Sequence, residues 1–232
     1  MRSIGLLGGM SWESTLDYYR RINRGVQAAR GGLHSAQVLL YSVDFAPLEA
    51  LQAAGDWDRA GVLLADGARR VQAGGADFLL LCTNTMHRVA PAIEAAIDIP
   101  LLHIADATAL ALQQAGLRRV GLLGTAFTME QAFYRGRLEA QHGLQVLLPA
   151  PADRSLVHRV IYEELCRGLI RDASRSDYRR VVEGLAESGA EAVILGCTEI
   201  GLLLSQHDTT VPLFDTTAIH ADAAVRRALA VS

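Results

Sequence analysis

The chain contains no lysine, so all 22 of its basic residues are arginine. Enzymes that use pyridoxal phosphate hold this cofactor as a Schiff base on a lysine side chain. Because no side chain here can form that bond, ordinary pyridoxal phosphate chemistry is excluded. The glycines near Gly8 also do not form the G-x-G-x-x-G pattern of dinucleotide binding, so we expect no cofactor.

Cysteine is scarce, and its pattern does not indicate a metal site or a set of disulfides. The three cysteines, Cys82, Cys166 and Cys197, are an odd number without metal-ligand spacing. Most histidines also lack paired ligand spacing, namely His34, His103, His142, His158, His207 and His220. We therefore expect no metal, and a reducing, cytoplasmic location.

Long apolar runs and basic stretches are missing as well. No apolar stretch approaches the roughly 20 residues of a membrane helix, and the apolar run Ile4 to Leu7 is too short for a signal peptide. The arginines are scattered and the net charge is only −3, which argues against nucleic-acid binding. The composition indicates an ordinary globular protein with a small-molecule ligand, and neither a nucleic acid nor a membrane as partner.

What the sequence does contain is an alternation of strands and helices. Residues 2–7 read as a strand, followed by a glycine turn and a helix over residues 13–29. Further apolar runs, mostly separated by helical segments, occupy residues 37–43, 77–82, 101–104, 120–123, 146–148, 192–195 and 213–214. This order predicts an α/β protein with mostly parallel sheets flanked by helices.

The chain also repeats itself. Segments 4–8, 75–77 and 99–102 resemble segments that follow 116, 114 and 112 residues later, at 120–124, 189–191 and 211–214. Three collinear matches predict two pseudo-symmetric halves. We expect the first domain to comprise residues 1–102 and a C-terminal helix that returns to it within residues 209–232, and the second domain to comprise residues 103–208. Thr83 and Cys197 then occupy equivalent strand ends, where α/β sheets bind ligands. We expect the active site in the cleft between the two domains.

Cys197 follows a buried-looking strand and precedes a helix or turn. Free backbone amides at a helix start bind carboxylates and lower a thiol's pKa toward roughly 3.5–7.5. The sequence therefore predicts that Cys197 is a thiolate at neutral pH and a general base.

Three segments resemble one known family: residues 4–14 (IGLLGGMSWES), 84–87 (NTMH) and 196–200 (GCTEI). They are similar to the aspartate/glutamate racemase family, and Glu199 favours its aspartate racemase branch because glutamate racemases usually have histidine there. The resemblance covers essentially the whole chain. It implies a cofactor-independent amino-acid racemase, frequently a homodimer, in which one residue removes the α-proton and another reprotonates the opposite face.

One departure from the family pattern concerns its first catalytic position. The family usually reads Cys-Asn-Thr-x-His, and alignment places Thr83 where the cysteine belongs, with Cys82 one residue too early. Successive residues of an extended segment point to opposite faces, so Cys82 is predicted to be a core thiol. Because a hydroxyl is a poorer base than a thiolate, Thr83 and Cys197 should treat the two enantiomers unequally.

The resemblance also implies a set of substrate-binding residues. They are Asn84, Thr85 and Thr198, which match the family's carboxylate cradle, together with Met10, Gln52 and Glu199. Acid-selective members carry a lysine near the segment that reads here Glu163 to Arg167. Either an arginine such as Arg167 substitutes, or the substrate is not aspartate, so a broader amino-acid specificity stays open.

Two other classes remain open. The first is a single-cysteine decarboxylase or maleate-type isomerase of the same superfamily, which Thr83 makes reasonable. The second is a non-catalytic amino-acid-binding protein. Heavy water separates them, because only a racemase exchanges the α-proton of an amino acid with solvent.

Overall fold

The computed structural model describes residues 1–230 and divides the chain into two compact units. The first unit comprises Met1–Ile104 and the chain from His220 onward, and the second comprises Ala105–Ile219. Among the described residues, no helix is both long enough and apolar enough to cross a membrane.

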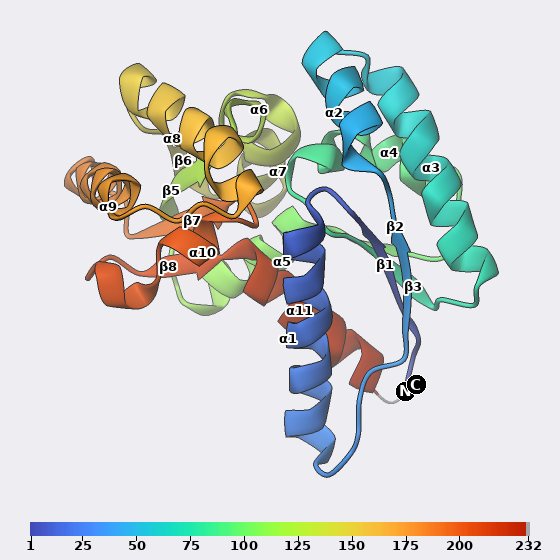
Figure 1. The fold of residues 1–232 in the computed structure, drawn as a ribbon. Coiled ribbons are helices and arrows are strands. Elements are labelled where there is room, and N and C mark those ends of the chain that lie inside the picture. Colours follow the sequence, from blue (N-terminus) through green and yellow to red (C-terminus); the bar gives the residue numbers. More distant parts are fainter. Residues whose placement is uncertain (231–232) are drawn as a thin grey trace. The chain divides into compact units, whose positions relative to one another are not determined.

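A four-stranded parallel sheet forms the centre of the first unit (Figure 1). Its strands are β1 (Ile4–Gly8), β2 (Val38–Ser42), β3 (Phe78–Leu81) and β4 (Leu101–Leu102). They lie in the order β2-β1-β3-β4, with β1 hydrogen-bonded to both β2 and β3. All carboxyl ends therefore meet at one edge of this sheet.

Helices cover both faces of the first sheet. Alternate residues of each strand point to opposite faces, so each face has its own apolar core. One core contains Leu7, Leu79 and Leu81 and packs against α2 (Phe45–Ala54), α3 (Trp57–Ala73), η1 (Thr85–Val89) and α4 (Ala90–Glu94). The other contains Leu6 and Leu80 and packs against α1 (Trp12–Arg30) and α11 (Thr216–Leu229).

The second unit repeats this sheet. Its strands are β5 (Arg119–Gly124), β6 (Gln145–Leu147), β7 (Ala192–Gly196) and β8 (Leu213–Asp215). They are parallel and lie in the order β6-β5-β7-β8, which is the order of the first sheet. The predicted fold class, two duplicated α/β halves with parallel sheets flanked by helices, is therefore confirmed, and every predicted strand is present.

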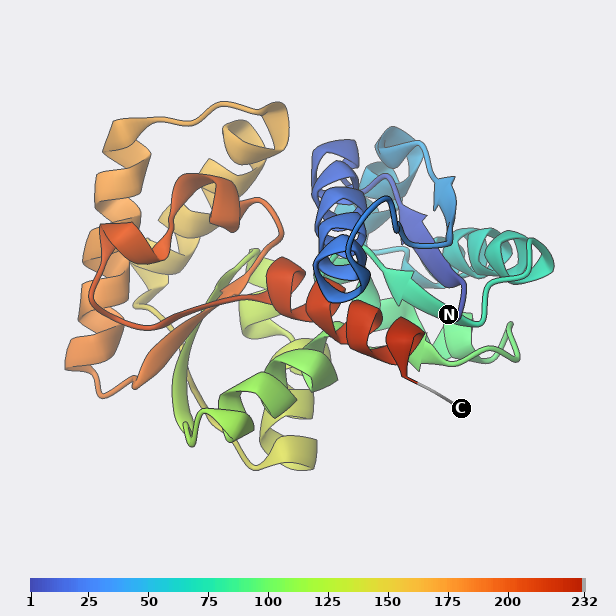
Figure 2. The same ribbon diagram turned by 90° about the horizontal axis from the view of Figure 1, so that it is seen from below.

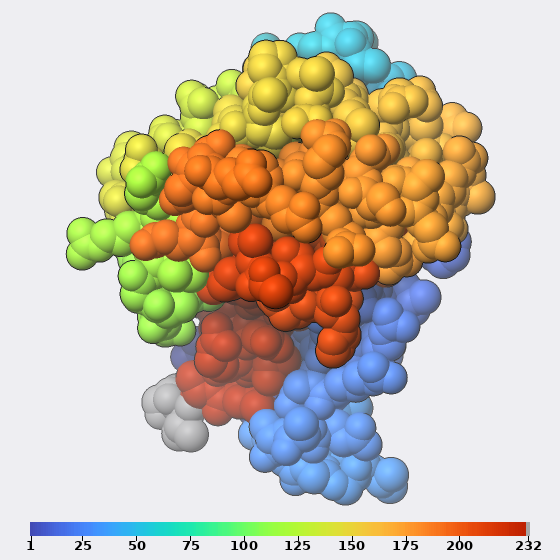
Figure 3. Space-filling view, turned by 90° about the vertical axis from the view of Figure 1, so that its left-hand side faces the viewer, coloured from blue at the N-terminus to red at the C-terminus, as the bar shows by residue number. Residues whose placement is uncertain are grey.

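Helices and short 3-10 segments surround the second sheet as well. They are α5 (Ile104–Gln114), α6 (Ala126–Glu130), α7 (Ala132–His142), α8 (Pro151–Glu163), η2 (Leu165–Arg167), α9 (Asp172–Glu187), α10 (Ile200–Leu203) and η3 (Gln206–Asp208). Helices α8 and α9 pack against β5, and Figure 2 shows them on one side of the strands. Figure 3 shows the outer surface that α8, α9 and the following segments form.

The chain passes between the two units inside helices. Helix α5 begins at Ile104, the last residue of the first unit before the chain enters the second. Helix α11 begins in the second unit, and the first unit resumes at His220 within it. Both connections are thus regular secondary structure.

Candidate active site

The first group of predicted site residues lies at the carboxyl edge of the first sheet. Thr83, Asn84 and Thr85 come after β3, separated from it by Cys82 alone, and all three are buried. Met10 follows the neighbouring strand β1 by two residues and packs into the core cluster against α2 and α3. Gln52 is buried on α2.

Cys82 belongs to the core, as its position in the sequence predicts. Its side chain is fully buried and packs with the α1 and α11 face of the sheet. Burial raises the pKa of this thiol far above its ordinary value, so it stays protonated. Thr83, and not Cys82, is therefore the reactive side-chain candidate at this strand end.

The second group lies at the carboxyl edge of the second sheet. Cys197, Thr198 and Glu199 follow β7 directly and are all buried. The Cys197 thiol donates a hydrogen bond to Glu199 Oε2 at 3.0 Å, and the Thr198 hydroxyl donates to the same oxygen at 2.8 Å. One carboxylate oxygen of Glu199 thus accepts both hydrogen bonds.

The expectation of a lowered Cys197 pKa is wrong. Burial raises the pKa of this thiol well above its ordinary value, and the negative charge of Glu199 and the nearby Cys166 raise it further. The helix that was expected to lower this pKa, α10, has four residues and starts only at Ile200. In the described structure Cys197 is a thiol that donates a hydrogen bond, and it needs a partner before it can act as a base.

The region around Cys197 includes two further groups that the sequence pattern did not connect with it. Tyr178 is buried and donates its hydroxyl hydrogen to Val157 O at 2.9 Å. Burial, followed by the nearby Cys197, raises the pKa of this tyrosine. Cys166 is half-buried in η2 and is close enough to act electrostatically on Cys197.

The arginine suggested for the missing lysine is exposed. Arg167 lies in η2 on the surface. The neighbouring carboxylate of Glu164 accepts a hydrogen bond from Ser174 at 2.6 Å and pairs with Arg171 at 3.6 Å. Arg171 therefore compensates a negative charge of the protein itself.

The predicted site residues thus fall into two groups, one in each unit, at equivalent places. Strands β3 and β7 hold the same position in the two sheet orders, and Thr83 and Cys197 follow them by two residues and one residue. The described residues contain no cluster of three or more histidine, cysteine or acidic side chains that could hold a metal ion.

Comparison with known proteins identifies the family of this chain. The family model for Asp/Glu/hydantoin racemases matches residues 7–224. The chain is a member of the Asp/Glu/hydantoin racemase family. The resemblance that the three sequence segments indicate is therefore confirmed.

Individual members of the racemase family match over nearly their whole length. A crystal structure of a candidate Asp/Glu racemase from Yersinia pestis is 56% identical, with a TM-score of 0.93 over 99% of this chain and 100% of that one. An aspartate racemase homologue from Pyrococcus horikoshii OT3 is 31% identical, with a TM-score of 0.83 over 98% and 99% of the two chains. The broad-specificity amino-acid racemase RacX of Bacillus subtilis is 24% identical over 98% of both chains.

Proposed function

We propose that the protein is a cofactor-independent amino-acid racemase in which Cys197 and Thr83 act on the same α-carbon. One group removes the α-proton and the other returns a proton to the opposite face. The observation that carries this proposal is the pair of equivalent strand ends. One presents a thiol that is hydrogen-bonded to a buried carboxylate, and the other presents a buried threonine. Membership of the racemase family supports it.

Glu199 supplies the proton acceptor that Cys197 requires. The thiol hydrogen already points at Glu199 Oε2 across 3.0 Å. Transfer of that proton leaves a thiolate and a carboxylic acid, and the thiolate then takes the α-proton to become a thiol again. This route removes one cause of the raised pKa of Cys197, because Glu199 loses its negative charge as the thiolate forms and the number of buried charges stays the same.

Thr83 makes the enzyme asymmetric. Among the described residues, no hydrogen bond to another residue engages its hydroxyl, so this group is available to a substrate. A hydroxyl loses its proton much less readily than a thiol that has a carboxylate beside it. We infer that the enantiomer whose α-hydrogen faces Cys197 reacts faster than its mirror image.

The substrate carboxylate is bound, in this proposal, by Asn84, Thr85 and Thr198. Removal of the α-proton moves negative charge onto the carboxylate, so hydrogen-bond donors at that position stabilise the transition state. Met10 and Gln52 contact the substrate from the first unit. The substrate is aspartate, glutamate or a broader set of amino acids. The last alternative is supported by the Bacillus subtilis relative, which is named a broad-specificity amino-acid racemase.

The proposal includes two wider features. The chain works in the cytoplasm, because the proposed chemistry requires a reduced Cys197. It acts as a homodimer, as the family resemblance implies.

Proton exchange in heavy water tests the proposed reaction. The protein is incubated separately with each enantiomer of a panel of amino acids, and deuterium at the α-carbon is measured by mass shift and chiral chromatography. We expect incorporation into both enantiomers of at least one amino acid, at unequal initial rates. Equal rates for the two enantiomers would contradict the asymmetric roles of Cys197 and Thr83.

Two substitutions assign the groups. Thr83→Cys should raise exchange of the slower enantiomer, because a thiol replaces the hydroxyl. Glu199→Gln should lower exchange of the faster enantiomer by about 10²- to 10⁴-fold, the usual contribution of a general base. Glu183→Gln, the same chemical change at an exposed residue of α9, is the control and should leave both rates unchanged.

A further inference from the structure

Three buried histidines lie together in the first unit, and the proposed reaction uses none of them. His87, His103 and His220 come from η1, from the residue after β4, and from α11. Their side chains are at most 5% exposed. The ring centroid of His87 lies 4.4 Å from that of His103 and 6.1 Å from that of His220.

The hydrogen bonds of His87 determine which of its ring nitrogens carries the proton. The backbone amide of Ile104 donates to His87 Nε2 at 3.3 Å. A backbone amide can only donate, so Nε2 is unprotonated and the proton of the neutral ring is on Nδ1. That N–H donates to the carbonyl oxygen of Thr83 at 2.7 Å. His87 therefore links Thr83 to Ile104.

His220 has the opposite tautomer, by the same reasoning. Its Nε2 lies 2.7 Å from the carbonyl oxygen of Leu102, which can only accept, so this nitrogen carries the proton. The unprotonated Nδ1 accepts from the hydroxyl of Tyr18 at 2.8 Å. His220 of α11 thus binds the carbonyl of Leu102, and Tyr18 of α1 holds the His220 ring in place.

The two histidines together fix one short segment, Leu102 to Ile104, from both ends. His220 binds the carbonyl of Leu102, His87 binds the amide of Ile104, and the ring of His103 packs on His87 between them. This is the segment at which the chain leaves the first unit. It is therefore a fixed point against which His87 can hold another group.

That other group is the backbone of Thr83. Its amide donates to Leu81 O at 2.9 Å, and its carbonyl accepts from His87. With both backbone polar groups bonded, only the rotation about χ1 remains to direct the hydroxyl, and in a β-branched residue this rotation is restricted. The direction of the Thr83 hydroxyl therefore depends on the bond from His87.

We propose that His87 is a positioning residue that holds Thr83 for proton transfer, with Tyr18 and His220 fixing the segment to which His87 is anchored. This inference rests on the proposed role of Thr83 as the weaker acid/base group. A displacement of the order of 1 Å at a reacting group costs about 10²-fold in rate. Because Thr83 is a weak acid/base group, a loss of this size would leave little exchange of the slower enantiomer.

Two substitutions of His87 separate its two hydrogen bonds. The side-chain amide of His87→Asn reaches about as far as Nδ1 and keeps a donor for the Thr83 carbonyl. The longer side chain of His87→Gln reaches about as far as Nε2. It keeps the hydrogen bond from the Ile104 amide and loses the one to the Thr83 carbonyl. We expect His87→Gln to lower deuterium exchange of the slower enantiomer by about 10- to 100-fold, and His87→Asn to restore most of it.

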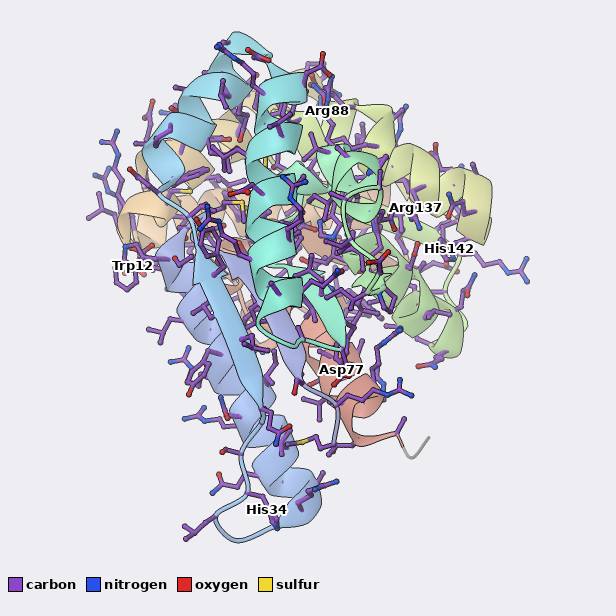
Figure 4. The ribbon with its side chains drawn as sticks, turned by 90° about the vertical axis from the view of Figure 1, so that its right-hand side faces the viewer. Trp12, His34, Asp77, Arg88, Arg137 and His142 are labelled. Carbon is purple, nitrogen blue, oxygen red and sulfur yellow. The ribbon has the colours of Figure 1, made fainter. Side chains whose placement is uncertain are left out.

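Exchange of the faster enantiomer, which uses Cys197, should stay unchanged in both variants. The control is His34→Gln, because His34 is exposed in the loop between α1 and β2, at the far end of the helix from Trp12 (Figure 4). Equal losses for both enantiomers in His87→Gln, or equal losses in His87→Asn and His87→Gln, would overturn the positioning role, because His87 would then be needed for general structure only.

A spectroscopic measurement tests the hydrogen bonds without activity. In the unaltered full chain labelled with 15N-histidine, the ring resonances of His87, assigned by their absence in His87→Asn, should show the proton on Nδ1. A proton on Nε2 would overturn this inference alone, even if both enantiomers exchange. An absence of exchange with every amino acid would overturn the proposed function, and with it the role of His87, whatever the tautomer.

Discussion

Glu199 is the residue whose importance the structure changes most. Sequence comparison assigns it to substrate binding, whereas in the structure its Oε2 accepts hydrogen bonds from both Cys197 and Thr198. One of its two carboxylate oxygens is therefore directed at the protein. This oxygen is the one that accepts the thiol proton in the reaction we propose.

His220 gives the protein a pH-dependent stability. Burial lowers the pKa of its ring to about 4, from an ordinary value of 6.5. Between these two values the unfolded chain binds a proton that the folded chain does not, so stability falls as the pH falls from 6.5 toward 4. Below the lower value both states are protonated and the loss is complete.

Replacement of His220 by glutamine tests this dependence. The glutamine amide can donate to the Leu102 carbonyl and does not titrate. Between pH 7 and pH 5, the free energy of unfolding of the unaltered protein should fall by about 2 kcal/mol more than that of His220→Gln. Urea unfolding at the two pH values measures the difference. Parallel losses in the two proteins would show that His220 does not titrate in this way.

At the residue scale, sequence reasoning was successful where a residue's environment depends on its immediate neighbours. Cys82 is buried because it continues a buried strand, as its alternation with Thr83 indicates. The pKa of Cys197 was predicted in the wrong direction, because burial and the charge of Glu199 outweigh any effect of the short helix that follows. The histidine cluster was missed because its members come from separate segments of the chain, and Tyr18 and His220, for example, are 202 positions apart.

At the scale of the element, the two sheets use glycine at the same place, the end of the first strand of each unit. A Cβ on Gly8 would lie 2.4 Å from Cγ2 of Thr15 on α1. A Cβ on Gly124 would lie 2.9 Å from the carbonyl oxygen of Gly196 and 3.1 Å from the Cβ of Thr128 on α6. These strand ends therefore pack too closely against their neighbours for a larger residue.

This crowding predicts opposite effects of alanine at two glycines of the second unit. Gly124→Ala should lower the free energy of unfolding by about 1–3 kcal/mol, because the backbone carbonyl of Gly196 cannot yield easily. Gly184→Ala should raise it by up to about 1 kcal/mol, because Gly184 is exposed inside α9 and no heavy atom lies within 4 Å of an added Cβ. Midpoints of urea unfolding measure both, and changes of the same sign would contradict the argument.

The elements themselves were largely readable from the sequence, since apolar runs and glycine turns predict all eight strands within a few residues. The packing of helices on one another was not predictable in this way, because the side chains that join them are far apart in sequence. Asp106 on α5, for example, binds Arg137 through two hydrogen bonds of 2.6 and 2.7 Å and contacts His142 at 2.9 Å. These side chains join α5 to α7 (Figure 4), and no local pattern indicates the pairing.

At the scale of the whole molecule, the proposed homodimer has a direct test. Four large apolar side chains, Trp12, Leu16, Tyr19 and Leu40, are between 47% and 64% exposed on α1 and the edge strand β2. Burial of such a patch is a common source of stability in association. Sedimentation velocity should show a species of about twice the chain mass of 25.0 kDa. A single species at the chain mass over the micromolar range would contradict the dimer.

The duplication was the most informative signal in the sequence, because three short matches at a nearly constant offset predicted both sheets and the equivalence of Thr83 and Cys197. The structure confirms the repeat in the identical strand orders of the two units. It adds that the chain passes between the units within α5 and α11. Sequence could not reveal this, because a helix that joins two units has the same periodicity as one inside a unit.

The identical strand orders also have a genetic consequence. A pair of identical half-length polypeptides would have to carry the same residue at both strand ends, so any mutation would appear twice. A single chain that contains both halves has a separate codon for each strand end. One strand end can therefore carry a hydroxyl, that of Thr83, while the other carries a thiol, that of Cys197.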